Sequence, residues 1–204
     1  MTKALVPHCR LIDRIAYGYY PTRKVLAGAN RVFRFGDRGN QWLTGLKRHA
    51  QLRDLQAMVS PEEYSDLFKF GFVRNPWDRE VSFYYYLRGA WGITGHAVAR
   101  ELGFEEFLRR RLENRPQGQI EWLNNADGSF GADYVGYFEN LEDDMQHICR
   151  QVGIKAPVVP RENISRKRAD RDYRSLYTDE TAALVARAYP EDIDKFGYVF
   201  DGRR

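Results

Sequence analysis

The sequence predicts an α/β fold in which a mainly parallel sheet is flanked by helices. Two short and strongly apolar segments, residues 67–73 and 134–138, have the composition of buried parallel strands. A helical pattern begins directly after each segment, and strands that alternate with helices are typical of parallel sheets. No internal repeat or low-complexity tract interrupts this alternation.

Length and composition predict one soluble globular domain over residues 1–204. Hydrophobic residues make up 43% and charged residues 29% of the chain, an ordinary balance for such a domain. Cys9 and Cys149 are too few for a disulfide framework or a metal site, so we expect no metal. No apolar run reaches the ~18 residues of a membrane span, and the N-terminus lacks a signal peptide, so we expect a cytoplasmic protein.

The charge pattern does not favour nucleic acid as a partner. A net charge of +4 is modest for a nucleic-acid-binding domain. The aromatic residues gather in the apolar strand segments, whereas stacking platforms for nucleic acid alternate aromatic residues with Lys and Arg. We therefore expect a partner of another kind.

Capping residues indicate where several helices begin and end. Ser60 and Asn75, each followed by a proline, are typical N-terminal caps. Asn140 is expected to cap a helix that ends at Gly153. Other expected elements are a short helix in residues 1–10, a strand over 31–35, helices over 49–59, 104–113 and 179–189, the last ended by Pro190, and a polar loop over 115–133.

Arg74 stands where the first apolar strand meets the following helix. Ligands of open α/β sheets bind outside the carboxyl ends of the strands, and a helix N-terminus offers N–H groups and a partial positive charge to an anion. Ser82 lies about two helical turns further on, so its hydroxyl can act only on a ligand that runs along the helix. A guanidinium and a hydroxyl together suit a phosphate monoester. The same spacing also fits an arginine that pairs with Asp78 beside a serine that is merely exposed.

Three segments carry a resemblance to a known family. Residues 74–84 read Arg-Asn-Pro-Trp-Asp-Arg-Glu-Val-Ser-Phe-Tyr, residues 133–141 read Asp-Tyr-Val-Gly-Tyr-Phe-Glu-Asn-Leu, and residues 192–198 complete the pattern. In this order they resemble the motifs of sulfotransferases that use 3′-phosphoadenosine-5′-phosphosulfate (PAPS). The resemblance is to the broad family of carbohydrate and heparan-sulfate 2-O-sulfotransferases and their bacterial relatives, and it covers roughly residues 47–200. It implies a three-layer, P-loop-like α/β fold.

The resemblance also implies which residues bind the donor. It places Arg74 and Ser82 on the 3′-phosphate of PAPS. It matches the basic segment after residue 162 to a loop that closes over the nucleotide, and five basic residues between 161 and 171 suit a donor with a phosphate and a phosphosulfate. A solvated basic loop without a ligand is the alternative. The further residues that the resemblance assigns to donor binding are Asn163, Ser165, Arg166, Lys167 and Tyr173.

His49 is the candidate general base. The resemblance places a catalytic histidine of the 2-O-sulfotransferase branch at a similar distance ahead of the nucleotide-binding strand. Sulfuryl transfer needs an acceptor hydroxyl that loses its proton as the S–O bond forms, and a histidine that titrates near neutrality can take that proton. A helix N-terminus favours the neutral imidazole, which is the form that accepts it. A histidine that only caps the helix is the alternative.

One part of the family pattern has no counterpart in the sequence. The 5′-phosphosulfate loop of the family, typically Pro-Lys-Thr-x-Gly-Thr-Ser, is absent, and residues 20–24 lack the Gly-Thr-Ser that would make them a replacement. We expect that the chain lacks this loop and the strand before it, with weak nucleotide binding and little turnover as the result. The neighbouring strand would then present an edge through which the chain could aggregate or form a homodimer.

These inferences converge on a sulfotransferase that moves a sulfuryl group from PAPS to a hydroxyl, with a carbohydrate as the expected acceptor. A noncatalytic module that binds a nucleotide or a sulfated glycan is the alternative. Trp91, Trp122 and the tyrosines at 84–86 could stack on a sugar ring, although packing in the core also explains such aromatic residues.

Overall fold

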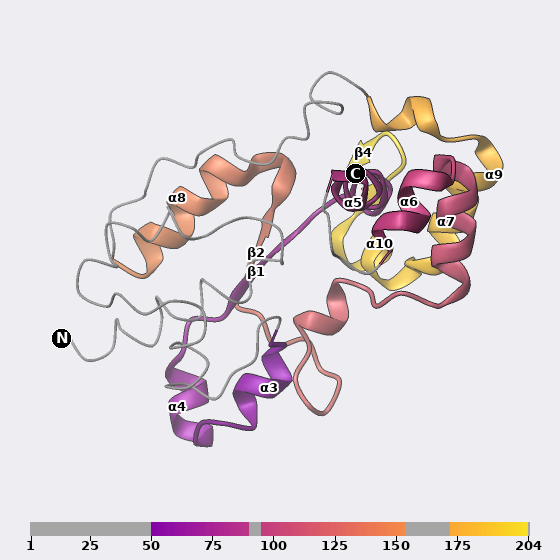
Figure 1. The fold of residues 1–204 in the computed structure, drawn as a ribbon. Helices are drawn as coiled ribbons and strands as arrows, with labels where there is room; N and C mark the ends of the chain where they lie inside the picture. Colours follow the sequence, from indigo (N-terminus) through magenta and orange to yellow (C-terminus); the bar gives the residue numbers. More distant parts are fainter. Residues whose placement is uncertain (1–49, 90–94, 154–171, 204) are drawn as a thin grey trace. The chain divides into compact units, whose positions relative to one another are not determined.

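The computed structural model describes residues 50–89, 95–153 and 172–203, which are coloured in Figure 1. They belong to two compact units, each built from segments that are not contiguous in the chain. The single domain over residues 1–204 stays a prediction, and the elements expected at 1–10 and 31–35 lie outside the described residues. In the described part of the chain, the first unit holds residues 50–73 and 119–153, and the second unit holds residues 74–89, 95–118 and 172–203.

The first unit contains a parallel pair of strands, β1 and β2. Phe70 lies opposite Tyr134 and Val73 opposite Tyr137, so the two strands end level with each other. This pair is consistent with the predicted α/β class, and the three-layer arrangement stays a prediction. The elements of the first unit are α3 (Leu52–Gln56), α4 (Pro61–Asp66), β1 (Phe70–Val73), the 3-10 turn η1 (Ile120–Trp122), β2 (Tyr134–Tyr137), the 3-10 turn η2 (Phe138–Asn140) and α8 (Leu141–Gln151).

Strand β1 is shorter than the apolar run that predicted it. Leu67 belongs to the end of α4, because its N–H donates to Tyr64 O at 3.3 Å. Lys69 then precedes the strand, with its N–H donating to the Asp133 carboxylate at 2.7 Å and its Nζ lying 2.8 Å from the same oxygen. The ion pair therefore lies at the N-terminal end of the two strands, and the pairing of β1 with β2 begins at the next residue.

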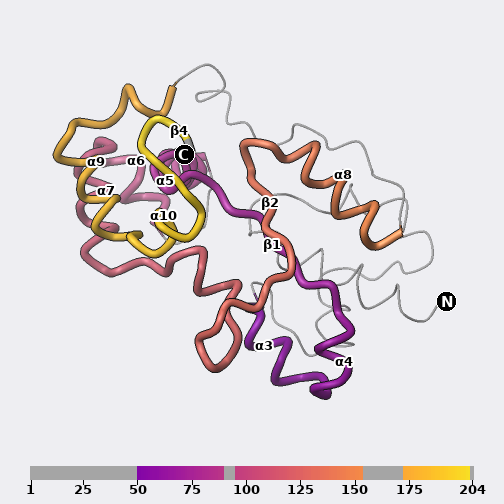
Figure 2. The backbone as a smooth tube through the Cα atoms, turned by 180° about the vertical axis from the view of Figure 1, so that it is seen from behind, coloured from indigo at the N-terminus to yellow at the C-terminus, as the bar shows by residue number. Residues whose placement is uncertain are grey.

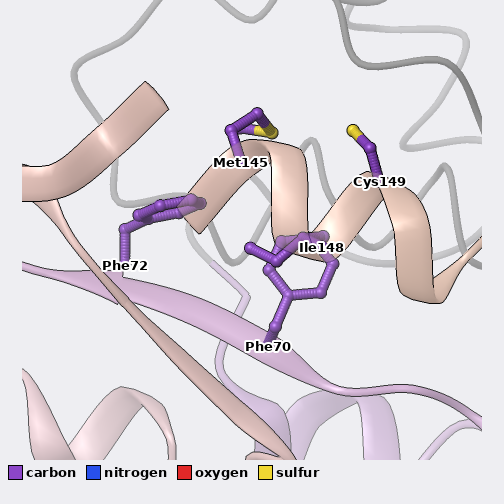
Figure 3. Close-up of a cluster of buried hydrophobic side chains, with 5 residues drawn as sticks. All are labelled: Phe70, Phe72, Met145, Ile148 and Cys149. Atoms are coloured by element: carbon purple, nitrogen blue, oxygen red, sulfur yellow. The ribbon is translucent and has the colours of Figure 1, made fainter. Parts of the chain in front are cut away.

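Helix α8 covers one face of β1 (Figure 3). Phe70 and Phe72 point toward the helix from alternate positions of the strand, as the two-residue period of a strand requires. Met145, Ile148 and Cys149 meet them from one face of the helix. Cys149 is buried among these side chains.

Helix α8 begins at Leu141, directly after Asn140 as predicted, but its cap differs from the prediction. Asn140 makes no hydrogen bond that caps the helix, because the chain enters α8 through the turn η2 and not from an extended segment. Its Nδ2 donates instead to the buried Asp144 carboxylate at 3.4 Å. The same carboxylate accepts Tyr137 N at 2.5 Å and Tyr134 OH at 2.8 Å, which ties the helix to β2. Gly153 follows the helix with a φ of 72°, in agreement with the predicted end.

Two short helices occupy the region where the sequence predicts a helix over 49–59 and a second helix that starts at Ser60. Helix α3 is only five residues long, because Ser60 is extended before a proline and opens a new helix. Ser60 Oγ accepts Glu63 N at 3.1 Å, and the Glu63 carboxylate accepts Ser60 N at 3.0 Å, which confirms the predicted cap. The small core between the helices contains Ala50, Leu52 and Leu55, with Val59, Tyr64 and Leu67 packed against it.

Helix α5 is central to the second unit (Figure 2). It packs against α6, α7, α9 and η3. Trp77, Val81 and Tyr84 lie on its buried side. Tyr84 contacts the rings of Phe104 and Phe107 at centroid distances of 5.4 and 5.1 Å. The elements of the second unit are α5 (Pro76–Gly89), α6 (His96–Glu101), α7 (Phe104–Glu113), the 3-10 turn η3 (Tyr173–Leu176), α9 (Asp179–Ala188), α10 (Pro190–Phe196), β3 (Tyr198–Val199) and β4 (Gly202–Arg203).

The C-terminal elements correct one prediction. Helix α9 ends at Ala188 as expected, but Pro190 is the first residue of a further helix, α10, and does not end the helical region. A proline fits there because the first turn of a helix leaves its N–H groups without intrahelical partners. Helix α6 and the antiparallel hairpin of β3 and β4 have no counterpart in the prediction.

A buried network of charges joins α5 to α7 and α10. Glu80 is fully buried, and its carboxylate accepts hydrogen bonds from Arg111 Nε and from Tyr189 OH, the latter at 2.6 Å. Next to it, Arg79 Nη1 lies 3.7 Å from the buried carboxylate of Asp192. Buried charges are tolerated when they are paired, so these contacts fix how α5 is turned about its own axis.

Gly136 of β2 leaves room for the ring of Phe72. A Cβ at position 136 would lie 2.4 Å from Phe72 Cε1. We predict that Gly136→Ala lowers the free energy of unfolding by about 1–3 kcal/mol, because the ring has to move. Gly89→Ala is the control, since nothing lies within 4 Å of a Cβ at that helical position and alanine favours a helix. Urea denaturation compares the two, and equal stability of both variants would contradict the prediction.

Candidate functional site

Asn75 fixes the start of α5. Its Oδ1 accepts hydrogen bonds from Trp77 N at 3.1 Å and from Asp78 N at 3.4 Å, which confirms the predicted cap. Its Nδ2 donates to Val199 O at 3.0 Å and to Gly202 O at 3.1 Å, in the two strands of the β3–β4 hairpin. One buried amide therefore holds the helix start and the C-terminal hairpin together.

Arg74, Asp78 and Ser82 follow one another at intervals of four residues, a spacing that places side chains on one side of a helix. Arg74 Nε donates to Asp78 Oδ2 at 2.6 Å, and Arg74 Nη2 lies 2.5 Å from the same oxygen. Arg74 Nη1 donates to Ser82 Oγ at 3.0 Å. The guanidinium of this Arg74–Asp78–Ser82 row therefore lies along the flank of α5 and not beyond its tip.

The row combines the two interpretations that the sequence left open. Arg74 does pair with Asp78, as the alternative to a binding site required, and their side chains are only 16% and 15% exposed. Ser82, however, is not merely exposed, because it is half-buried and its Oγ accepts a hydrogen bond from the Arg74 guanidinium. The structure thus brings the two predicted phosphate ligands into direct contact.

The hydrogen bond between Arg74 and Ser82 sets the direction of the serine proton. Ser82 Oγ accepts a hydrogen bond from Arg74 Nη1, and a guanidinium has no acceptor, so the O–H of Ser82 points away from it toward another group. An anion beside the row would receive hydrogen bonds from a cation and from a hydroxyl. The N-terminal end of α5 adds a partial positive charge, and the carboxylate of Asp78 opposes it.

Tyr173 lies in η3, which packs against α5. Its hydroxyl donates to Phe200 O, so its only proton is used within the protein. Three rings surround Phe200 edge-on, those of Tyr173, Trp77 and Tyr177, at centroid distances of 5.9, 5.8 and 5.5 Å. A contact between Tyr173 and a nucleotide would therefore involve its ring and not the hydroxyl proton.

Tyr173 is also the site residue with the clearest electrostatic perturbation. Its pKa is raised to about 12, mainly by burial and further by the charges of Asp78, Asp172 and Asp201, while Arg174 acts in the opposite direction. A tyrosine with this pKa is neutral at physiological pH.

Five predicted site residues lie outside the described residues: His49, Asn163, Ser165, Arg166 and Lys167. Within residues 50–89, 95–153 and 172–203, no group of three or more His, Cys, Asp and Glu side chains is arranged to hold a metal ion. Across the same described segments, no helix is both long and apolar enough to cross a membrane.

The region that contains this row matches a known protein family. The sequence model of the sulfotransferase family aligns with residues 39–199. This chain belongs to the sulfotransferase family. The aligned region includes the Arg74–Asp78–Ser82 row and both strands of the parallel pair. Membership supports sulfuryl transfer as the general reaction of this sulfotransferase.

A relative of this sulfotransferase is found among curated proteins. A protein from Archaeoglobus fulgidus, described as uncharacterized, is 32% identical over 123 residues, which are 58% of this chain and 92% of the relative. No solved structure matches the sulfotransferase significantly. The relative's description names no donor or acceptor, so inferences about both depend on the site itself.

Sequence reasoning missed the contribution of the C-terminal hairpin to the site of this sulfotransferase. The available signal was the pair Asp201-Gly202, because Asp-Gly is a frequent turn sequence, and Asp201 lies in the loop between the two strands. Strands of two residues are too short to show an alternating pattern. The link from Asn75 to this hairpin spans more than 120 positions in the chain, and no local pattern indicates it.

The raised pKa of Tyr173 predicts a loss of stability at alkaline pH. In the folded state the pKa is about 12, against the ordinary 10.0, so folding keeps the proton bound more tightly. The resulting stabilisation is present below pH 10 and is lost as the pH rises toward 12. We predict that Tyr173→Phe flattens the decline of the unfolding free energy over this range, as measured by urea denaturation at several pH values. An unchanged slope in Tyr173→Phe would contradict the prediction.

Proposed function

We propose that this sulfotransferase uses PAPS as its donor and that Arg74 and Ser82 hold the 3′-phosphate of the nucleotide. The observation that supports this most is the bond of 3.0 Å between Arg74 Nη1 and Ser82 Oγ. It places a cation and a hydroxyl donor side by side on the flank of α5. A phosphate monoester, with several acceptor oxygens and a negative charge, is complementary to such a pair.

The position of the row on the helix supports a nucleotide over a small anion. A small anion at a helix tip would be held by backbone N–H groups. Here the guanidinium lies along the helix and bonds to Ser82, so a ligand that contacts both side chains has to lie beside α5. An extended donor with phosphates at both ends of its ribose can place one phosphate on this flank. The rest of the nucleotide then has to reach other residues.

The segment from Asn163 to Tyr173 would supply those residues. Its polar and basic side chains Asn163, Ser165, Arg166 and Lys167 are proposed to close over the nucleotide, as the family resemblance implies. Five basic residues between 161 and 171 would offset the charge of the donor. Tyr173 would contribute its ring, because its hydroxyl is bonded to Phe200 O.

His49 is proposed as the general base. As the acceptor oxygen attacks sulfur, a new S–O bond forms and the bond from sulfur to the oxygen of the 5′-phosphate breaks. The hydroxyl proton passes to the imidazole of His49, and adenosine-3′,5′-bisphosphate leaves with the electron pair of the broken bond. The acceptor is proposed to be a carbohydrate hydroxyl, since the sequence resembles the carbohydrate and heparan-sulfate 2-O-sulfotransferase branch.

A second candidate is a noncatalytic module that binds a nucleotide or a sulfated glycan. The observation in its favour is that the sequence contains no Pro-Lys-Thr-x-Gly-Thr-Ser loop for the 5′-phosphosulfate. Transfer of labelled sulfate from PAPS to a glycan mixture distinguishes the two candidates. Turnover that depends on His49 supports the enzyme, whereas nucleotide binding without turnover supports the module.

The donor site is tested by calorimetric titration with adenosine-3′,5′-bisphosphate. We predict that Arg74→Ala weakens binding roughly tenfold to a hundredfold, the effect of losing hydrogen bonds to a charged group. Ser82→Ala should weaken binding less, because it removes one neutral donor. Arg109→Ala is the matched control, since Arg109 belongs to the same unit and pairs with Glu105 and Glu180 at the surface.

Equal losses of affinity in Arg74→Ala and Arg109→Ala would show that binding depends only on overall positive charge. Absence of binding by the unaltered chain would rule out the proposed donor site altogether.

A further inference from the structure

We infer that Asp78 is a positioning residue of the donor site, which holds the Arg74 guanidinium in the direction that reaches Ser82. This inference depends on the proposed binding of a 3′-phosphate by Arg74 and Ser82. It adds a role for a carboxylate that would otherwise be expected to repel the ligand.

The geometry of the ion pair carries the inference. Arg74 Nε and Nη2 both contact a single oxygen, Asp78 Oδ2, at 2.6 and 2.5 Å. The two contacts grip one edge of the planar guanidinium and leave it little freedom to rotate. The remaining nitrogen, Nη1, then meets Ser82 Oγ at 3.0 Å. The direction of Arg74 toward Ser82 is therefore a consequence of where Asp78 stands.

Asp78 is itself held in place. It lies in the first turn of α5, where its N–H donates to Asn75 Oδ1 at 3.4 Å. A carboxylate in a first turn is stabilised by the partial positive charge of the helix N-terminus. Its side chain is 15% exposed, so the pair with Arg74 is shielded from much of the solvent. A shielded and well-oriented pair restricts motion more than a surface ion pair does.

Charge and position make opposite predictions for the removal of this carboxylate. If Asp78 acted on the ligand only through its charge, its removal would relieve repulsion and tighten the binding of a phosphate. If Asp78 holds Arg74, its removal frees a long side chain that must be ordered again when the ligand binds, and affinity falls. The sign of the change in affinity separates the two accounts.

Substitutions at position 78 provide the test, with calorimetric titration of adenosine-3′,5′-bisphosphate on the full chain. Asp78→Ala should weaken binding roughly tenfold or more, because a misplaced contact group loses much of its effect. Asp78→Asn should stay within about threefold of the unaltered chain, since one amide oxygen can accept both Arg74 contacts. Asp78→Glu keeps the charge but displaces the oxygen, so it should also weaken binding.

Two further readouts separate positioning from a general loss of structure. The melting temperature of each variant is measured, and Asp78→Glu serves if Asp78→Ala fails to fold. The NMR signal of Arg74 Nε–H should be protected from exchange in the unaltered chain and in Asp78→Asn, and should broaden or vanish in Asp78→Ala. The NMR spectra of all three proteins are recorded without nucleotide, so the signal reports on the order of the Arg74 side chain alone.

Unchanged or tighter binding in both Asp78→Ala and Asp78→Glu would overturn the inference. Equal losses in Asp78→Asn and Asp78→Ala would also overturn it, because the hydrogen-bond geometry would then have no part in the effect. These outcomes differ from failure of the proposed function, in which the unaltered chain itself would not bind the nucleotide.

Discussion

The rotation of α5 about its axis is the constraint on which the candidate site depends. Glu80 is fully buried, and its carboxylate needs both Arg111 and Tyr189 as partners. At about 100° per residue, Glu80 lies about 200° from Asp78 and from Ser82, on nearly the opposite side of the helix. A rotation of α5 that turned Glu80 outward would break both contacts and leave the partly buried guanidinium of Arg111 without its carboxylate, which is costly. The Arg74–Asp78–Ser82 row therefore has to face away from the buried charges.

The start of α5 is fixed as firmly as its rotation. Asn75 bonds to the first turn of the helix and to both strands of the C-terminal hairpin. Beside it, Tyr177 OH donates to Trp77 O at 2.9 Å, and Trp77 Nε1 donates to Ala182 O at 2.9 Å. These contacts connect the helix that carries the site to η3, α9 and the hairpin. A binding site whose side chains are already ordered gives up less conformational freedom when the ligand arrives.

The sequence was sufficient to predict the elements with strong local signals. The apolar runs around Phe70 and Tyr134, and the caps at Ser60 and Asn75, correspond to elements of the structure because each depends on neighbouring residues. Asn140 stands directly ahead of α8 as predicted, but its side chain does not cap the helix, because a cap also depends on how the chain enters the helix, which the turn η2 determines.

The candidate site was predictable in part. The four-residue spacing of Arg74, Asp78 and Ser82 was visible, and so was the choice between an ion pair and a phosphate ligand. In the actual arrangement, Arg74 donates hydrogen bonds to both Asp78 and Ser82, and this depends on the rotamer of the Arg74 side chain. The hairpin's bonds to Asn75 depend on contacts between distant parts of the chain, for which a local pattern carries no information.

The most direct test of the central claim is a crystal structure of the full chain with adenosine-3′,5′-bisphosphate. The row predicts a 3′-phosphate on the flank of α5, with oxygens about 3 Å from the Arg74 guanidinium and from Ser82 Oγ. A nucleotide bound elsewhere, with its 3′-phosphate in contact with neither side chain, would contradict the assignment.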